Sequence, residues 1–225
     1  MIVAKLKKLF DLVQNSLRSN PDRFLKEVAG VVHVGANAGQ ERDIYDAYGL
    51  DVIWIEPIPK IFNQLNTNIR GFKKQRAFQA LFTDVDDREY EFKIASNNGA
   101  SSSIFDFKQH SEVWPSVRYL DTVLLKSVTL PSFFKKHRLD VSKFQALVLD
   151  TQGSELLVLQ GSLPILHNFK FVKTEVPDFE SYEGCCQLSD INFFMNQYGY
   201  KEFSKRKFAS RKGIGNYFDV VYKKQ

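Results

Sequence analysis

The chain has 225 residues, of which 44% are hydrophobic and 25% charged, a composition typical of a globular protein long enough to bury a core. Its net charge of +5 permits an anionic partner without requiring one, because the basic residues form short clusters. The two cysteines are adjacent and no apolar run reaches the roughly 18 residues that span a bilayer, which excludes a disulfide scaffold and a membrane-spanning bundle and favours a cytoplasmic protein.

Apolar residues near the N-terminus recur at helical spacing: Ile2, Leu6, Leu9, Phe10 and Val13. They predict an amphipathic helix that packs on the domain or on a partner subunit, with contact to a membrane surface as the alternative. Lysines interrupt this segment and no small-residue cleavage site follows, so it does not resemble a secretory signal. Asn20 and Pro21 predict the start of a second helix that ends before Gly30. Residues 1–29 are therefore expected to form an N-terminal helical extension.

From residue 30 onward, strand and helix patterns alternate. Buried strands are predicted over residues 31–34, 51–55, 76–82, 145–150 and 169–176. Helices are predicted over about 40–48, 59–69, 131–137, 155–161 and 188–197. Residues 90–95 predict a strand exposed on one face, residues 96–120 a loop, and residues 200–203 and 217–222 a closing β pair. This alternation predicts a three-layer α/β sandwich, a mostly parallel sheet with an antiparallel final strand, in one domain over residues 30–225.

The first strand of this domain runs into a loop with two glycines. Ligands of open parallel sheets bind outside the carboxyl ends of the strands, where this loop is expected to lie. Gly35 permits a tight turn and close backbone approach, and Gly39 lets the next helix lie against the sheet. The G-x-x-x-G spacing differs from the dinucleotide fingerprint and from the P-loop, so a plain structural turn is an equal interpretation of the loop alone.

Glu56 strengthens the case for a ligand. It ends the second predicted strand, where a carboxylate can accept hydrogen bonds from two ribose hydroxyls. A strand-end carboxylate that faces water is the alternative. Together, the glycine loop and Glu56 predict an adenosine-containing cofactor.

Three stretches carry a resemblance to a known family: VGANAGQE (34–41), WIEPIPKIFNQLNTNI (54–69) and LDTQGSELLVLQGS (149–162). In sequence and in order they resemble the FkbM family of S-adenosylmethionine-dependent methyltransferases, over about residues 31–176. The last stretch carries the family's D-x-x-G-x-E pattern as Asp150, Gly153 and Glu155. The resemblance implies the Rossmann-like class I methyltransferase fold and methyl transfer to a hydroxyl of a sugar, a glycan or a small-molecule natural product.

The expected cofactor-binding residues are His33, Gly35, Ala36, Asn37, Gly39, Gln40, Glu56, Pro57, Asp84, Ser102 and Asp150. Asp84 follows the third predicted strand, where class I enzymes commonly contact adenine, although its Asp-Val-Asp-Asp setting is equally typical of a turn. Ser102 stands in the loop 97–103, which either contacts the cofactor or acceptor or is solvated.

Two positions depart from the family's pattern. The family often has aspartate where this chain has His33, and lysine where it has Val148. His33 can lie beneath the glycine loop and hydrogen-bond its backbone in a supporting role; a core histidine and a catalytic histidine are the alternatives. The missing lysine argues against a positive charge beside Asp150 as part of the mechanism.

Methyl transfer to a hydroxyl requires a group that takes the hydroxyl proton. Asp150, at the end of a buried strand, is the candidate general base or metal ligand, with a helix-capping role as the alternative. Glu175 ends the neighbouring strand and is a second catalytic candidate. Glu155 lies in the first helical turn, where structural help is as well supported as catalysis. A magnesium-like ion held by Asp150, Glu175 and Asp178 is permitted by these residues but not favoured.

The remaining residues of interest are predicted to lie in the core or on the surface, and two further functions are considered. Trp54 and Phe62 are predicted to be core, whereas His110, His137 and His167 are predicted to be surface residues. The basic cluster KRKFASRK (205–212) motivates an RNA methyltransferase as an alternative. Nucleic acid is nevertheless disfavoured as a partner, because no recognisable RNA-binding module is appended. A non-catalytic binding protein with a methyltransferase-like fold is the third hypothesis, because fold does not fix function.

Overall fold

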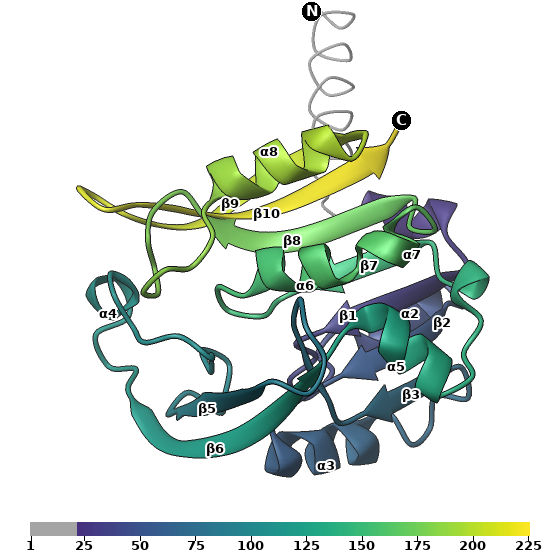
Figure 1. The fold of residues 1–225 in the computed structure, drawn as a ribbon, viewed down its shortest axis with the longest axis horizontal. Helices are drawn as coiled ribbons and strands as arrows, with labels where there is room; N and C mark the ends of the chain where they lie inside the picture. Colours follow the sequence, from purple (N-terminus) through teal and green to yellow (C-terminus); the bar gives the residue numbers. More distant parts are fainter. Residues whose placement is uncertain (1–21) are drawn as a thin grey trace, which may run out of the picture.

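The computed structural model describes residues 22–225 (Figure 1). The predicted amphipathic helix and the Asn20–Pro21 pair lie outside the described residues. The described part of the second predicted helix is a 3-10 helix, η1 (Arg23–Glu27). Its Phe24 and Leu25 are buried and join a core cluster with strand residues of the sheet. Residues 23–27 therefore pack into the domain.

A seven-stranded sheet forms the centre of the molecule, in the order β3-β2-β1-β7-β8-β10-β9. Its members are β1 (Gly30–Val34), β2 (Asp51–Ile55), β3 (Gln75–Phe78), β7 (Ala146–Leu149), β8 (Phe171–Pro177), β9 (Tyr200–Arg211) and β10 (Gly215–Lys224). The first five are parallel, and β10 is antiparallel to both of its neighbours. The predicted mostly parallel sheet with an antiparallel final strand is confirmed. The strand order reverses between β1 and β7, which marks the ligand-binding edge of such sheets.

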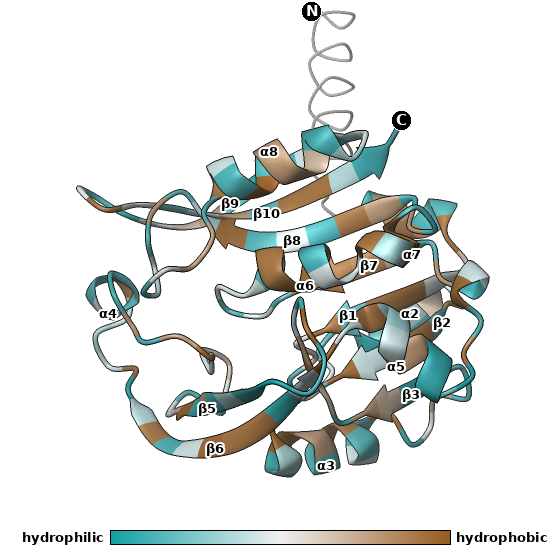
Figure 2. Cartoon of the chain, in the orientation of Figure 1, coloured by the Kyte–Doolittle hydropathy of each residue, from teal (hydrophilic) through white to brown (hydrophobic). Residues whose placement is uncertain are grey.

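Helices cover both faces of this sheet (Figure 1). One face packs against α5 (Leu130–Lys136), α6 (Glu155–Gly161), α7 (Leu163–Leu166) and α8 (Leu188–Gln197). The other packs against η1, α2 (Arg42–Ala47) and α3 (Pro59–Asn68). Because side chains alternate along a strand, Val32 and Val34 join the first core and Val31 the second. Figure 2 shows the hydrophobic residues concentrated along these central strands. The predicted three-layer sandwich is confirmed.

A second, three-stranded sheet was not predicted. It contains β4 (Leu81–Phe82), β5 (Glu89–Ala95) and β6 (Tyr119–Val128), in the order β4-β6-β5. The predicted loop over 96–120 instead includes a short helix, α4 (His110–Val113), and the first residues of β6. The strand predicted over 76–82 is also divided, because β3 joins the main sheet and β4 pairs with β6. In the first half of β6, Leu120 and Leu124 face solvent, so the apolar residues of this strand do not mark a buried face.

The predicted core and surface positions of the aromatic residues and histidines are confirmed, with one exception. Trp54 is fully buried, Phe62 is half-buried, and His137 and His167 are exposed. The surface prediction for His110 is wrong, because this side chain is 1% exposed and its ring stacks on Phe107 with centroids 4.4 Å apart. Its polar sequence neighbours concealed an aromatic cluster that forms only when distant loops meet. A short 3-10 helix, η2 (Val141–Lys143), precedes β7. No helix within residues 22–225 is long and apolar enough to cross a bilayer.

Candidate functional site

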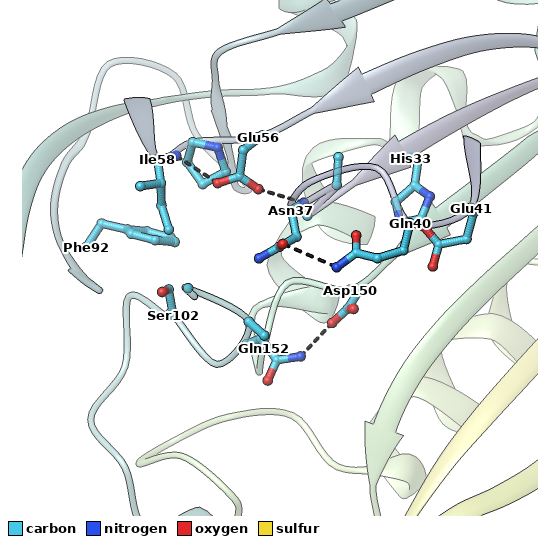
Figure 3. Close-up of a pocket in the computed structure, with 15 residues that line it drawn as sticks. His33, Asn37, Gln40, Glu41, Glu56, Ile58, Phe92, Ser102, Asp150 and Gln152 are labelled. Atoms are coloured by element: carbon cyan, nitrogen blue, oxygen red, sulfur yellow. Dashed lines mark hydrogen bonds between the residues drawn. The ribbon is translucent and has the colours of Figure 1, made fainter. Parts of the chain in front are cut away.

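The glycine loop after β1 forms one wall of a cavity at the carboxyl ends of β1, β2 and β7 (Figure 3). Gly35 has φ +82°, a conformation strained for other residues, and a Cβ there would lie 1.8 Å from the carbonyl oxygen of Asp150. The N–H groups of Gly35 and Ala36 both donate to the carbonyl of Ile55, at 3.0 and 2.9 Å. The loop therefore joins the ends of three strands and leaves no room for a side chain at position 35.

Glu56 holds the loop from the end of β2. Its Oε2 accepts the N–H of Asn37 at 2.9 Å, and its Oε1 accepts the N–H of Ile58 at 2.8 Å. The side chain is buried, and burial raises the pKa of Glu56 to about 7 although both hydrogen bonds favour the carboxylate. Each carboxylate oxygen can accept a further hydrogen bond, so both remain able to accept from ligand hydroxyls.

The cavity brings together all the predicted cofactor-binding residues except Gly39 and Asp84. Its volume is about 660 Å³ when the open mouth is included. Ile58 and Phe92 lie at one end, and His33 and Glu41 at the other (Figure 3). Four lining residues were not predicted: Glu41, Ile58, Phe92 and Gln152. Gly99 and Ala100 also line the cavity, and they belong to the loop 97–103, for which ligand contact was one of the two predicted roles. Glu41 and Ile58 adjoin residues that were predicted, which is the signal that could have found them.

The lining carries three carboxylates, Glu41, Glu56 and Asp150. None of the described residues that line it is a lysine or an arginine, and the pKa of His33 is lowered by burial. An imidazole with a lowered pKa is neutral at pH 7. The cavity therefore has the charge to receive a cation.

Asp150 stands at the end of β7, with its side chain in the cavity wall. Its Oδ1 accepts a hydrogen bond from Nε2 of Gln152 at 2.5 Å. Burial raises the pKa of Asp150, and neighbouring carboxylates raise it further. The turn's backbone N–H groups go to Glu155, so the helix-capping alternative for Asp150 is not the arrangement seen.

Glu175 lies beside Asp150, on β8, outside the cavity lining. Burial and the charge of Asp150 raise the pKa of Glu175 well above its usual range. Its partner across the strand pair is Asp219 of β10, and Asp219 forms an ion pair with Arg206 of β9 at 2.6 Å. A row of charged side chains thus continues from Asp150 along the edge of the sheet.

Glu155 has a structural position in place of the catalytic one considered from the sequence. It is 1% exposed and does not line the cavity. Its carboxylate accepts the N–H of Thr151 at 2.8 Å and the N–H of Gly153 at 3.0 Å. These hydrogen bonds fix the turn between β7 and α6, and Asp150 is positioned at the start of that turn.

Three further predicted residues lie away from the cavity. Asp84 follows β4 and not β3, and its exposed segment packs beside α6, where Gly161 leaves room for it. Gly39 shapes the start of α2, with φ +73° and the side chain of Leu65 close by. Asp178 accepts the N–H of Asn216 at 2.7 Å and its side-chain amide at 2.8 Å. Residues 22–225 contain no group of three or more His, Cys, Asp or Glu arranged to hold a metal ion.

His33 lies beneath the glycine loop, as expected, but it bonds a different partner. Its Nδ1 lies 3.0 Å from the hydroxyl of Tyr45, and its ring stacks on Trp54 with centroids 4.9 Å apart. The prediction of a hydrogen bond to the loop backbone is therefore wrong. The imidazole faces the α2 side of the sheet because it alternates with Val32 and Val34 along β1, and there Tyr45 of α2 meets it.

The chain is similar to known methyltransferases in sequence. Residues 33–202 match the family model described as the methyltransferase FkbM domain. The 2-O-methyltransferase NoeI of Sinorhizobium fredii (strain NBRC 101917 / NGR234) is 24% identical over 169 residues. That alignment covers 72% of this chain and 68% of NoeI.

Solved structures are similar in fold. Streptococcus pneumoniae Sp1610, a putative tRNA (m1A22) methyltransferase in complex with S-adenosylmethionine, has a TM-score of 0.53 and 11% identity, over 93% of this chain and 72% of that one. The METTL16 methyltransferase domain has a TM-score of 0.55 and 8% identity, over 90% of this chain and 64% of that one. M. capricolum TrmK, bound to S-adenosylhomocysteine, has a TM-score of 0.51 and 7% identity, over 91% and 67%. At these identities the likeness establishes the class I methyltransferase fold.

Proposed function

The chain belongs to the FkbM-domain family of S-adenosylmethionine-dependent methyltransferases, and we propose that it methylates a hydroxyl of a sugar, a glycan or another small-molecule acceptor. The observation that carries the hydroxyl chemistry is a half-buried carboxylate, Asp150, in the wall of the cavity. NoeI, a 2-O-methyltransferase, supports the same reaction. We further propose a cytoplasmic location, and a methyltransferase domain that includes the buried segment 23–27 together with residues 30–225.

The cavity fits the cofactor. S-adenosylmethionine supplies an electrophilic methyl group on a positively charged sulfur. Glu56 accepts hydrogen bonds from the ribose hydroxyls, and Ile58 and Phe92 provide an apolar surface for adenine. Glu41 and Asp150 favour the positive charge. The three carboxylates of the lining support a cofactor orientation with adenine at Ile58 and Phe92 and the positive sulfur near Glu41 and Asp150.

Asp150 acts as the general base. A carboxyl group whose pKa is raised accepts a proton more readily near neutral pH than an ordinary aspartate. The acceptor O–H bond breaks and its proton passes to Asp150, while the oxygen forms the new bond to carbon and the sulfur keeps the electron pair of the bond that breaks. Glu175 lies beside Asp150, and the repulsion between these two carboxylates raises the proton affinity of both.

Polar groups beyond Asp150 suit an acceptor with several hydroxyls. Glu175 and Asp219 offer acceptors and Arg206 offers donors along the same edge of the sheet. Carboxylate and guanidinium groups together recognise the alternating donors and acceptors of a sugar ring. We therefore propose that the acceptor enters from the β8–β10 side.

The direct test incubates the full chain with radiolabelled S-adenosylmethionine and three acceptor panels: mono- and oligosaccharides, other small hydroxy compounds, and total RNA. Label in a sugar or small hydroxy compound that survives mild base, as an ether does, supports the proposal. Label in RNA alone contradicts it.

RNA stays the second candidate, favoured by one observation. Strand β9 and the turn after it expose Lys205, Lys207, Arg211 and Lys212. If these residues hold RNA, binding should weaken steeply with salt, and neutralising them should abolish it. Salt-insensitive, acceptor-specific methylation of a sugar would exclude this candidate.

The carboxylates of the cavity predict a pH-dependent preference for S-adenosylmethionine over S-adenosylhomocysteine. Burial and neighbouring carboxylates raise the pKa of Asp150, one of the carboxylates assigned to the positive charge, to about 7, so it gains charge as pH rises through 7. A positively charged sulfur benefits from that charge and a neutral thioether does not. Calorimetry from pH 6 to 9 should show the affinity ratio rising by about tenfold in favour of the sulfonium. A flat ratio would contradict the assignment of these carboxylates to the cation.

Replacing His33 by aspartate should leave cofactor binding intact. The aspartate can accept a hydrogen bond from Tyr45, but it loses the stacking on Trp54 and is buried. We expect the Kd to change by less than about fivefold. The free energy of unfolding should fall by about 1–3 kcal/mol, measured by chemical denaturation. Complete loss of cofactor binding in this variant would contradict the supporting role proposed for His33.

A further inference from the structure

Gln152 connects the Asp150 carboxylate to a distant loop. Its side-chain Nε2 donates to Asp150 at 2.5 Å, and its Oε1 accepts the hydroxyl of Tyr182 at 2.7 Å. Tyr182 stands in the segment between β8 and α8 and is 2% exposed. The hydroxyl of Tyr182 thus meets the oxygen of the amide whose nitrogen meets Asp150.

This contact fixes which end of the amide faces the carboxylate. A tyrosine hydroxyl within reach of acceptors donates its single proton, and its neighbours here are Oε1 of Gln152 and the carbonyl of Ser101 at 3.4 Å. Burial raises the pKa of Tyr182 well above its usual range, so the hydroxyl keeps its proton. With Oε1 held by Tyr182, the amide presents its N–H to Asp150.

The backbone of Gln152 is held as firmly as its side chain. Its φ is +53°, a left-handed conformation that costs energy in a residue other than glycine. The hydroxyl of Ser103 donates to the carbonyl of Gln152 at 2.7 Å. Tyr182 is itself fixed by Phe107, whose ring centroid lies 5.6 Å away and whose backbone pairs with it. Two loops outside the main sheet therefore position one amide.

We propose that Tyr182 and Gln152 are a positioning pair that holds the Asp150 carboxylate ready to accept the acceptor's proton. The proposal rests on the proposed hydroxyl methylation and on Asp150 as its base. An N–H directed at a carboxylate favours the ionised form, which opposes the effect of burial. Without Tyr182 the amide is free to turn its oxygen toward Asp150, and the carboxyl group then holds its proton to higher pH.

Several charged groups face Asp150 and act on the same equilibrium. Glu41 precedes α2, Glu155 lies in α6, and Asp219 lies in β10 beside Arg206. Glu56 and Glu175 also interact with Asp150 through their charges. All the carboxylates raise the proton affinity of Asp150, and the Gln152 amide is the hydrogen bond that lowers it. Loss of that bond should therefore produce a shift in one direction.

The test measures cofactor affinity against pH, which needs no acceptor. In Tyr182→Phe, the pH at which S-adenosylmethionine affinity rises should move upward by about 0.5–1 pH unit, with affinity at pH 9 within about twofold of the unaltered protein. Gln152→Asn tolerates the left-handed backbone but shortens the amide, and it should shift the profile in the same direction. Once an acceptor is known, methyl transfer in Tyr182→Phe should fall by about tenfold at pH 7 and recover toward pH 9.

The matched control is Tyr200→Phe. The Tyr200 hydroxyl is also buried and donates to the carbonyls of Leu166 and Phe169, at 2.7 Å each, away from the cavity. It should lose stability without moving the profile. In an Asp150→Asn background, Tyr182→Phe should also produce no shift.

An unchanged profile in Tyr182→Phe and Gln152→Asn overturns the positioning pair, as does an equal shift in Tyr200→Phe or in the Asp150→Asn background. If Tyr182→Phe does not fold, Gln152→Asn decides. The pH profile is measured by cofactor binding and needs no methyl acceptor. Failure to methylate any hydroxyl would therefore overturn the proposed function without affecting the test of the positioning pair.

Discussion

Replacing Gly35 by valine should abolish S-adenosylmethionine binding while the chain still folds. A Cβ at this position meets the Asp150 carbonyl at 1.8 Å, and backbone that carries main-sheet hydrogen bonds cannot give way as a flexible side chain can. The loop must move away from β7, which breaks the N–H contacts to Ile55 and displaces the Asn37 N–H from Glu56. Calorimetry should detect no binding at cofactor concentrations of about 100 times the unaltered Kd. Circular dichroism should retain the helix and strand signal.

Gly49 provides the matched control for this substitution. It has φ +66° at the end of α2, and a Cβ there meets nothing within 4 Å. Gly49→Val therefore introduces similar backbone strain, about 1–2 kcal/mol, without a collision near the cavity. It should bind the cofactor as the unaltered protein does. Binding by Gly35→Val, or equal loss in Gly49→Val, would contradict the role assigned to the loop.

The central sheet could be predicted because its strands are buried on both faces. The stretch VVHV is apolar except for His33 and runs into Gly35, and DVIWI is apolar after Asp51 and is followed by Glu56 and Pro57. Helices with clear end signals separate such stretches. The glycine loop and Glu56 followed from this, since the carboxyl ends of adjacent parallel strands lie together. Local sequence was sufficient wherever the main sheet determined position.

The second sheet and the loops around the cavity could not be predicted in the same way. Strand β6 exposes Leu120 and Leu124, so its apolar residues do not mark one buried face. The position of Asp84 was misjudged for the same reason, because β3 ends at Phe78 and Asp84 follows β4, a strand of the second sheet. His110 and Tyr182 are buried only because their loops meet, and sequence separation hides such contacts.

Roles within the D-x-x-G-x-E pattern also required the structure. The sequence gives Asp150 and Glu155 similar standing as carboxylates near the start of a helix. In the fold, Glu155 turns to the backbone N–H groups of its own turn, whereas Asp150 turns to the cavity. One carboxylate holds the turn and the other lines the cavity. Replacement of Asp150 and replacement of Glu155 should therefore have different effects on methyl transfer.

Asp150→Asn should reduce methyl transfer by about 10³-fold, within the range that general bases contribute. Asparagine has nearly the same shape and can still accept the hydrogen bond from Gln152, but it cannot take a proton from the acceptor. Cofactor binding should persist, weakened by about tenfold at most through loss of one negative charge. Single-turnover methylation with saturating cofactor separates the chemical step from binding.

Glu155→Gln is the contrasting variant, because it alters the neighbouring carboxylate of the same pattern. The glutamine amide oxygen can still accept one of the hydrogen bonds that the N–H groups of Thr151 and Gly153 donate to Glu155. The turn should therefore loosen while Asp150 keeps its carboxylate. We expect a loss of about 1–3 kcal/mol in the free energy of unfolding. Turnover per folded molecule should fall by less than about tenfold, far less than in Asp150→Asn. If the two variants lose turnover equally, Asp150 acts through the turn's structure, and the proton must pass to another group, for which Glu175 is the nearest candidate on the neighbouring strand.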